Sequence, residues 1–309
     1  MMAVKQKGVT AMSKKIAVIN DLSGFGRCSL TAAISVISAM GVQPCPLPTA
    51  ILTAQTGYPD YYCDDYTDKM ELFRSYWEKM GQRFDGIYTG FVAGERQILQ
   101  IFRFLDTFRT QENFLLVDPV MGDNGKTYDL FTPPLLREMR RLALDADIIT
   151  PNLTELCLLT EQDHGKIAKI QDPASLMEKV AHLGRELCAQ GPRHVIVTGI
   201  QFRDEKDTEQ MGNLYVTHSE SRLFSFPHIG GSYSGTGDLF ASCIAAGAAR
   251  DMDLGRAIQL AGTFLEAGLA DTVREKIPRN DGINYEKYLA LLIPEEHQQA
   301  EKEADPHEI

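Results

Sequence analysis

Strand-like apolar runs alternate with helix-like segments along nearly the whole chain, and this alternation limits the folds that the chain can adopt. Short runs rich in β-branched residues, such as Lys15–Asn20, Asn113–Val120 and His194–Gly199, are separated by segments with helical spacing. The alternation continues without a break in composition. It therefore predicts a single doubly wound α/β domain, with a mostly parallel sheet and helices on both faces.

The apolar periodicity also predicts where the individual elements lie. The expected strands are Lys15–Asn20, Val42–Leu52, Asp85–Phe91, Asn113–Val120, Ala146–Pro151 and His194–Gly199. The expected helices are Leu30–Met40, Lys69–Met80, Glu95–Phe108, Pro133–Asp145, one opening at Asn152 or Leu153, Pro173–Gln190, Thr236–Arg250 and Leu254–Thr272. A polar loop is expected over residues 201–210, and a hairpin over Asn213–Phe226. The expected domain spans residues 14–293, between a disordered lead-in at 1–13 and an acidic, mobile tail at 294–309.

Charge and hydropathy exclude two classes of partner. The net charge of −11 argues against a nucleic-acid-binding surface, which needs clustered Lys and Arg. No apolar run is long enough to span a bilayer, and the first fifteen residues lack the apolar core of a signal peptide. The six cysteines are scattered without metal-binding spacing, which favours buried thiols, a reducing compartment and a cytoplasmic protein.

The ends of the expected strands give a candidate site. In a doubly wound sheet, ligands bind beyond the carboxyl ends of the strands. Five residues are expected at those ends: Asp21, Gly90, Asp118, Thr150 and Thr198.

A glycine-rich loop with the sequence SGTGD precedes the helix expected from Thr236. Gly235 and Gly237 allow a tight turn, so that consecutive backbone N–H groups can converge on one point. The helix that follows adds unsatisfied N–H donors and the positive end of its dipole. The loop therefore favours a nest for a phosphate or for charge that develops during phosphoryl transfer. The alternative is that Asp238 only stabilises the first turn of the helix.

Two better-known phosphate motifs fail. A Walker A loop ending in the GKT at residues 125–127 would need a glycine where Val120 stands. The segment SGFGRCS has Ser29 at the third glycine position of a dinucleotide fingerprint, and no acid follows at the distance that a ribose requires.

Acidic and amide side chains near other strand ends suit a metal–phosphate site. Asp118 ends a strand and Asp123 lies in the loop after it, while Asn152 and Glu155 are one helical turn apart. Oxygen ligands near a phosphate nest suit a Mg²⁺ ion that keeps several waters. Asn152 could instead be only a helix cap, with Glu155 its neighbour.

The combination of DPVMGD, IITPNLTE and SGTGDLFAS, in this order and spacing, resembles the ribokinase superfamily and, within it, the pyridoxal kinases. The segments PTAILTAQTGY (Pro48–Tyr58) and IYTGF (Ile87–Phe91) are similar to the vitamin-B6-binding segments of that branch. The resemblance runs from about Lys15 to about Ile293.

This resemblance implies ATP- and Mg²⁺-dependent phosphorylation of the 5′-hydroxymethyl group of pyridoxal, pyridoxine or pyridoxamine. Asp238 is then the base, kept ionised by the helix terminus, and Gly235, Thr236 and Gly237 form the anion hole. The resemblance also implies that Asp118, Asn152 and Glu155 organise the metal and the phosphates, directly or through water. Asp123 and Thr150 are expected to lie along the phosphates. Thr198 is expected to approach the nucleotide, and Thr56 to contact the ring substituents. A homodimer is implied by the resemblance alone, and a need for a monovalent cation such as K⁺ is left open.

The sequence departs from the family pattern at the substrate end. Asp21 stands where a substrate-contacting serine is expected, with Ser23 close behind, so that the residue recognising the ring is left open. Phe91 replaces a tyrosine and could stack on the ring or be simply buried, and Asp21 could only cap a turn. A hydroxymethylpyrimidine kinase, or another small-alcohol kinase of the superfamily, is the alternative function. A non-catalytic binder is disfavoured by the intact Asp238 loop.

Overall fold

The computed structural model describes residues 13–294, and within them the strands form one large sheet and a small ribbon. The order of the sheet is β11-β10-β9-β8-β5-β4-β1-β2-β3. Its strands are β1 (Lys15–Ser23), β2 (Gln43–Leu52), β3 (Cys63–Asp65), β4 (Gly86–Thr89), β5 (Phe114–Val117), β8 (Ile148–Ile149), β9 (His194–Arg203), β10 (Glu209–Val216) and β11 (Ser221–Pro227). The ribbon pairs β6 (Gly122–Asp123) with β7 (Lys126–Thr127).

The six central strands, from β9 across to β2, pair in parallel, and the antiparallel pairs lie at the two edges. At one edge β9, β10 and β11 form an antiparallel ribbon, and at the other β3 pairs with β2. The expected fold, a mostly parallel doubly wound sheet, is confirmed.

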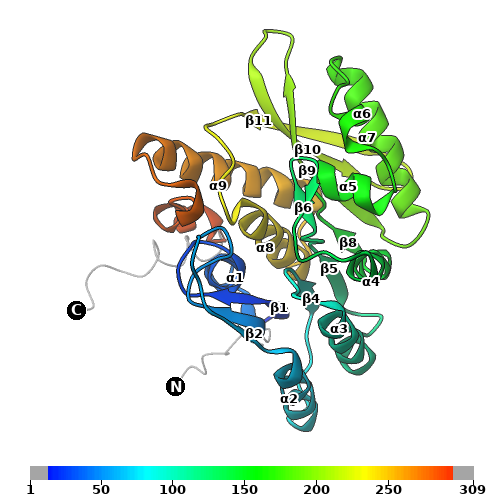
Figure 1. Ribbon diagram of the computed structural model, residues 1–309, viewed down its shortest axis with the longest axis vertical. Helices are drawn as coiled ribbons and strands as arrows, with labels where there is room; N and C mark the ends of the chain where they lie inside the picture. The colour runs from blue at the N-terminus through cyan, green and yellow to red at the C-terminus, as the bar shows by residue number, and fades with distance from the viewer. Residues whose placement is uncertain (1–12, 295–309) are drawn as a thin grey trace, which may run out of the picture.

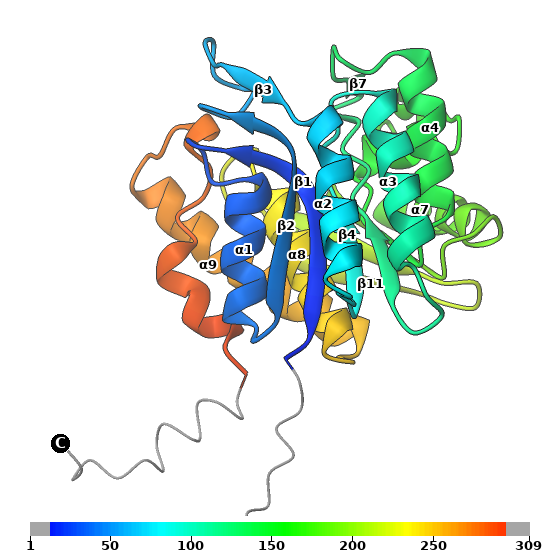
Figure 2. The ribbon, with the colours of Figure 1, turned by 90° about the horizontal axis from the view of Figure 1, so that it is seen from below.

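Helices cover both faces of the sheet (Figures 1 and 2). One face carries α2 (Thr67–Lys79), α3 (Glu95–Phe108), α4 (Pro133–Leu144), α5 (Leu153–Leu159), α6 (His164–Ile167) and α7 (Pro173–Cys188). The other carries α1 (Ser29–Ala39), α8 (Thr236–Ala249), α9 (Leu254–Arg274) and the short turn η2 (Glu286–Leu292), while η1 (Arg279–Asp281) lies just after α9. Each face has its own apolar cluster, so that the sheet is buried on both sides, as parallel sheets require.

The helix α8 lies deep within its layer. Its small side chains, among them Ala241, Ala245 and Ala246, are fully buried and let it pack against the sheet and against α1 and α9. This packing places the N-terminus of α8 at the carboxyl-end edge of the sheet.

The segment after Gly199 differs from expectation. The predicted polar loop over residues 201–210 is wrong, because β9 continues to Arg203 and β10 begins at Glu209. The two strands form an antiparallel hairpin at the sheet edge, where polar side chains can face solvent. The expected hairpin at Asn213–Phe226 is confirmed as part of β10 and β11. Thr198 consequently lies inside a long strand, close to where its parallel pairing ends, and not at the strand's end.

Other expectations are met in part. Four of the six thiols are buried, but Cys63 is exposed on β3 and Cys45 is half-buried, so the prediction of uniformly buried cysteines is wrong for these two. None of the helices within residues 13–294 is long and apolar enough to cross a membrane. The predicted lead-in and tail fall, but for one residue each, outside the described residues.

Candidate active site

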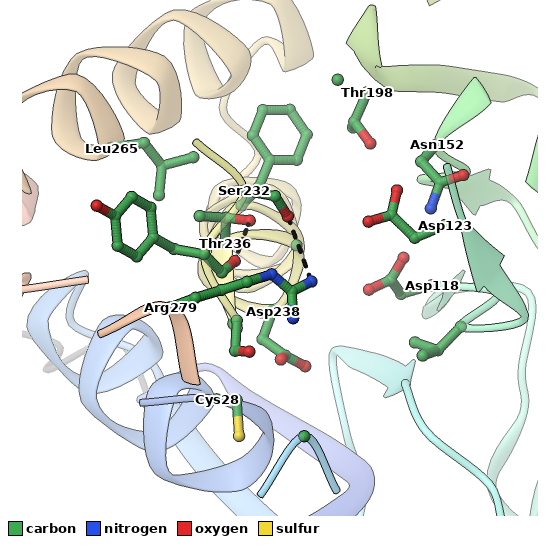
Figure 3. Close-up of a pocket in the computed structure, with 18 of the residues that line it drawn as sticks. Cys28, Asp118, Asp123, Asn152, Thr198, Ser232, Thr236, Asp238, Leu265 and Arg279 are labelled. Carbon is green, nitrogen blue, oxygen red and sulfur yellow. Dashed lines mark hydrogen bonds between the residues drawn. The ribbon is translucent and has the colours of Figure 1, made fainter. Parts of the chain in front are cut away.

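A cavity of about 730 Å³ opens at the carboxyl ends of the parallel strands, in front of the N-terminus of α8 (Figure 3). Every residue to which a role was assigned from the sequence lines this one cavity: Asp21, Ser23, Thr56, Phe91, Asp118, Asp123, Thr150, Asn152, Glu155, Thr198, Gly235, Thr236, Gly237 and Asp238. Gly90, expected among the strand-end residues of the site, directly follows β4 but does not line the cavity. Residues that are up to 217 positions apart in the sequence, from 21 to 238, are therefore brought together by the topology of the sheet.

The N-terminus of α8 is open towards the cavity. Gly235 is its N-cap residue, with φ +82°, and no side chain caps the helix. A Cβ at position 235 would lie 1.9 Å from the backbone oxygen of Arg27, so that both the backbone conformation and the packing require glycine. Uncapped N–H groups at the positive end of a 14-residue helix favour an anion in front of them.

Asp238 lies in the first turn of α8 and faces the cavity (Figure 3). Its Oδ1 accepts a hydrogen bond from Asn20 Nδ2 at 3.1 Å. Burial, opposed by a backbone hydrogen bond from Ser29 and reinforced by the charge of Asp21, raises the pKa of Asp238 to about 6. At this pKa Asp238 is still largely ionised at neutral pH. The loss of solvent outweighs the helix dipole, so that the pKa lies above that of a free aspartate. The higher pKa makes Asp238 a stronger base.

Asn20, at the end of the apolar run in β1, was not predicted as a site residue. Its side chain is fully buried, and its Oδ1 accepts hydrogen bonds from the backbone N–H groups of Asp21 (2.9 Å) and Phe91 (2.8 Å). Its amide thus joins the ends of β1 and β4 to Asp238. The only signal in the sequence is a polar residue at the end of an otherwise apolar strand.

Asp118 follows β5 on the opposite side of the cavity from α9. One carboxylate oxygen, Oδ1, accepts a hydrogen bond from Thr150 Oγ1 at 3.0 Å. The other, Oδ2, lies 3.8 Å from the position that a Cβ on Gly237 would occupy, so it faces the start of α8. Burial and the negative charge of Asp238 raise the pKa of Asp118 to about 7. A buried carboxylate whose pKa is raised by the charge of a second carboxylate favours a cation nearby.

Asn152 and Glu155 form a capping box at the start of α5. Asn152 Oδ1 accepts from the Glu155 N–H at 3.0 Å, and Glu155 Oε2 accepts from the Asn152 N–H at 2.8 Å. The pair also braces the loop after Asp118, because Glu155 Oε1 accepts from the Met121 N–H (3.0 Å) and Asn152 Nδ2 donates to the Gly122 oxygen (2.8 Å). The cap interpretation of Asn152 is confirmed. It does not exclude a role beside the metal, since both side chains line the cavity.

The donor set fits a magnesium ion that is shared with bound phosphates. The described residues contain no group of three His, Cys, Asp or Glu side chains arranged to hold a metal by themselves. Mg²⁺ usually binds through one or two carboxylates, substrate phosphates and waters. Asp118 has an oxygen directed into the cavity, whereas the oxygens of Glu155 and Asn152 already accept backbone N–H groups.

The other end of the cavity is formed by the end of β1 and by the loop after β2. Ser23 Oγ donates to Asp21 Oδ2 at 2.8 Å, and both side chains are buried. Thr56 and Phe91 line the same end. Gln55, which was not predicted, donates from Nε2 to Ser234 Oγ (3.3 Å) and so ties this loop to the SGTGD loop.

Arg279 also lines the cavity and was not predicted. It lies in η1, after α9, and Figure 3 shows its side chain extending across the start of α8. No sequence motif surrounds it, so only the folded chain brings it to the site.

A doubly wound sheet with strand-end carboxylates facing an open helix N-terminus defines a ribokinase-like kinase. The chain belongs to the phosphomethylpyrimidine kinase family, whose model matches residues 24–281.

Several individual relatives are named as kinases of vitamin B6 compounds or are solved with pyridoxal. The chain is 27% identical to the pyridoxine/pyridoxal/pyridoxamine kinase of Bordetella avium, over 80% of this chain and 82% of that protein. A crystal structure of a candidate phosphomethylpyrimidine kinase from Bacteroides thetaiotaomicron, in a form with pyridoxal, has a TM-score of 0.82 and 36% identity, covering 91% of this chain and 96% of that chain. The pyridoxal kinase of Leishmania donovani, solved with ADP, shares the fold with a TM-score of 0.75 and 21% identity, covering 91% and 96% of the two chains.

Proposed function

We propose that this protein phosphorylates the 5′-hydroxymethyl group of B6 vitamers with ATP, in salvage of pyridoxal 5′-phosphate. The observation that carries the proposal is the placement of Asp238 at the open N-terminus of α8, across the cavity from Asp118. The kinase names of the relatives, the pyridoxal in one structure and the ADP in another support the same reaction.

In this proposal the Asp238 carboxylate accepts the proton of the substrate hydroxyl. The hydroxyl oxygen forms a bond to the γ-phosphorus as the bond to the ADP oxygen breaks, so that the products are the phosphate ester, ADP and a proton. The backbone N–H groups of Gly235, Thr236 and Gly237 stabilise the charge on the transferred group. Asn20 keeps Asp238 oriented while the proton moves.

On the nucleotide side, we assign Asp118 to the metal, with Asn152 and Glu155 acting through the braced loop or through water. Asp123 and Thr150 lie along the phosphates and Thr198 approaches the nucleotide. Bound Mg²⁺ would neutralise phosphate charge and orient the γ-phosphoryl group.

On the substrate side, Asp21 or Ser23 recognises the ring, with Thr56 and Phe91 beside it. Of the two, the Asp21 carboxylate is the better acceptor of a hydrogen bond from the ring. Burial raises its pKa, although hydrogen bonds from Ser29 and Ser23 oppose this rise. A homodimer and a cytoplasmic location complete the proposal. Family resemblance supports the homodimer, and the six free cysteines, all within the described residues, support the cytoplasmic location.

The proposal is tested by incubating the purified protein with ATP, Mg²⁺ and one alcohol at a time, and by identifying products by mass spectrometry. Pyridoxal, pyridoxine and pyridoxamine should each gain one phosphoryl group. Hydroxymethylpyrimidine is included because the family to which the chain belongs is described as phosphomethylpyrimidine kinase. Phosphorylation of the pyrimidine alone would transfer the assignment to that substrate, and no turnover of any alcohol would refute a kinase role.

A further inference from the structure

The charge of the cavity wall poses a problem for a nucleotide. Seven carboxylates line the cavity: Asp21, Asp118, Asp123, Asp129, Glu155, Asp238 and Glu266. Among the lining residues in the described part of the chain, Arg279 is the only Lys or Arg. The carboxylates repel a polyphosphate that enters the cavity unless cations neutralise part of their negative charge.

The backbone of Arg279 is held beside the SGTGD loop. The Ser234 N–H donates to the Arg279 oxygen at 3.1 Å, one residue before the N-cap of α8. The next residue, Asn280, accepts from Gln55 Nε2 at 3.1 Å, which ties the same turn to the loop at the substrate end. The backbone of Arg279 is therefore held between the SGTGD loop and the loop after β2.

The side chain of Arg279 has no strong protein partner. Its Nη2 reaches Ser232 Oγ at 3.5 Å, the limit of a hydrogen bond, and no carboxylate lies within ion-pair distance of it among residues 13–294. Other arginines of the chain are firmly paired, such as Arg74 with Glu71 at 2.5 Å and Arg109 with Asp147 at 2.8 Å. Figure 3 shows the guanidinium crossing the start of α8, with Asp118 and Asp123 on the far side.

We propose that the Arg279 guanidinium contacts the phosphoryl group while that group passes from the nucleotide to the acceptor hydroxyl, and that Arg279 is a further catalytic residue of this site. The proposal rests on the phosphoryl transfer proposed above. A guanidinium offers paired N–H donors in a planar fork that matches two phosphate oxygens. It donates these hydrogen bonds without giving up a proton, and it approaches from the side opposite to Asp118.

The test compares Arg279→Ala and Arg279→Lys with Arg256→Ala. Arg256 is exposed on α9 and does not line the cavity, so its loss removes the same charge from elsewhere. Arg279→Ala should lower kcat on the order of 100-fold or more, while the dissociation constant for the unphosphorylated vitamer, measured by calorimetry, stays unchanged. Arg279→Lys should recover part of the loss, and Arg256→Ala should keep the parental kcat.

Chemical rescue distinguishes a contact between Arg279 and the phosphoryl group from a purely structural role of Arg279. Guanidinium chloride at non-denaturing concentration should raise the kcat of Arg279→Ala, whereas sodium chloride at equal ionic strength should not. A parental kcat in Arg279→Ala would overturn the proposal. So would a loss of kcat that guanidinium fails to restore and that accompanies a lowered Tm, since Arg279 would then be structural.

Failure of the proposed function would look different. If the parent protein phosphorylates no B6 vitamer, that function fails, and the role of Arg279 is then measured with whichever alcohol is turned over or, failing any, with ATP binding. Weaker ATP binding in Arg279→Ala than in Arg256→Ala would still support a phosphate contact, and equal binding would overturn it.

Discussion

At the scale of single residues, the site depends on two carboxylates whose environments favour different tasks. Asp238 is held by Asn20 at an open helix terminus, and Asp118 is held by Thr150 across the cavity. Burial raises the pKa of both. In the proposed reaction, the first takes a proton and the second meets a cation.

Replacing Asp238 by Asn should lower kcat by about 10²–10⁴-fold, because the proton acceptor is lost while the shape of the site is kept. Nucleotide affinity, measured by calorimetry, should stay within the error of the parent value. A near-parental kcat would show that Asp238 is not the base.

The same assignment predicts the direction of the pH dependence. A base works in its deprotonated form, so kcat/KM should rise with pH through about 6, the pKa of Asp238, and level off above it. Steady-state rates between pH 5 and 8 measure this, in buffers of constant ionic strength. A rate that falls with increasing pH across this window would contradict the assignment.

At the scale of secondary-structure elements, the proposed reaction uses the N-terminus of α8 to stabilise the charge of the transferred phosphoryl group. The two glycines at this terminus meet different requirements. A Cβ on Gly235 would strike the Arg27 backbone, whereas the nearest atom to a Cβ on Gly237 is Asp118 Oδ2 at 3.8 Å. Gly235 is thus required by the fold, and Gly237 by the space in front of the helix.

Gly237→Ala should therefore keep the parental Tm but lower kcat, because its methyl group occupies the space of the transferred phosphoryl group. Gly235→Ala is the matched comparison and should lower the Tm as well. Thermal unfolding and steady-state kinetics on both variants check this. Full activity in Gly237→Ala would contradict an anion site at this position.

The capping box of α5 predicts a separate effect on stability. Asn152→Ala removes the cap and the bond to Gly122, and should lower the free energy of unfolding by about 1 kcal/mol or more. Urea unfolding measures this. An unchanged free energy would mean that the box contributes nothing to stability.

At the scale of the whole molecule, the acidic side chains of the cavity lower the stability of the folded protein when they are ionised. The pKa of Asp118 is raised to about 7 in the folded protein, against about 3.9 for an unfolded chain. Folding then binds a proton, so the stability that Asp118 contributes is full below about pH 4 and is lost as the pH rises through about 7.

Without metal or nucleotide, Asp118→Asn should therefore gain stability over the parent at pH 8, and less at pH 5. Urea unfolding at the two pH values tests this, with Asp106→Asn, an exposed carboxylate on α3, as the control. A larger loss of stability in Asp118→Asn at pH 8 than at pH 5 would contradict the sign.

The sequence predicted the parallel core and the glycine-rich loop because their signals are local: apolar runs, helical spacing and the SGTGD pattern. Asn20 and Arg279 could not be found in this way. Arg279 reaches the cavity only through long-range backbone contacts such as that with Ser234. The β9–β10 hairpin resembled a loop because an edge ribbon accepts polar side chains that a buried strand would not.

Phosphoryl transfer from ATP to a B6 alcohol can be tested in a single competition assay. The protein is given ATP, Mg²⁺ and an equimolar mixture of pyridoxal, pyridoxine, pyridoxamine and hydroxymethylpyrimidine, and initial product ratios are read by mass spectrometry. We predict that phosphorylated B6 vitamers dominate, and that Asp238→Asn lowers their rate of formation by about 10²–10⁴-fold. A mixture in which phosphorylated hydroxymethylpyrimidine dominates, or in which no alcohol is phosphorylated, would contradict the account.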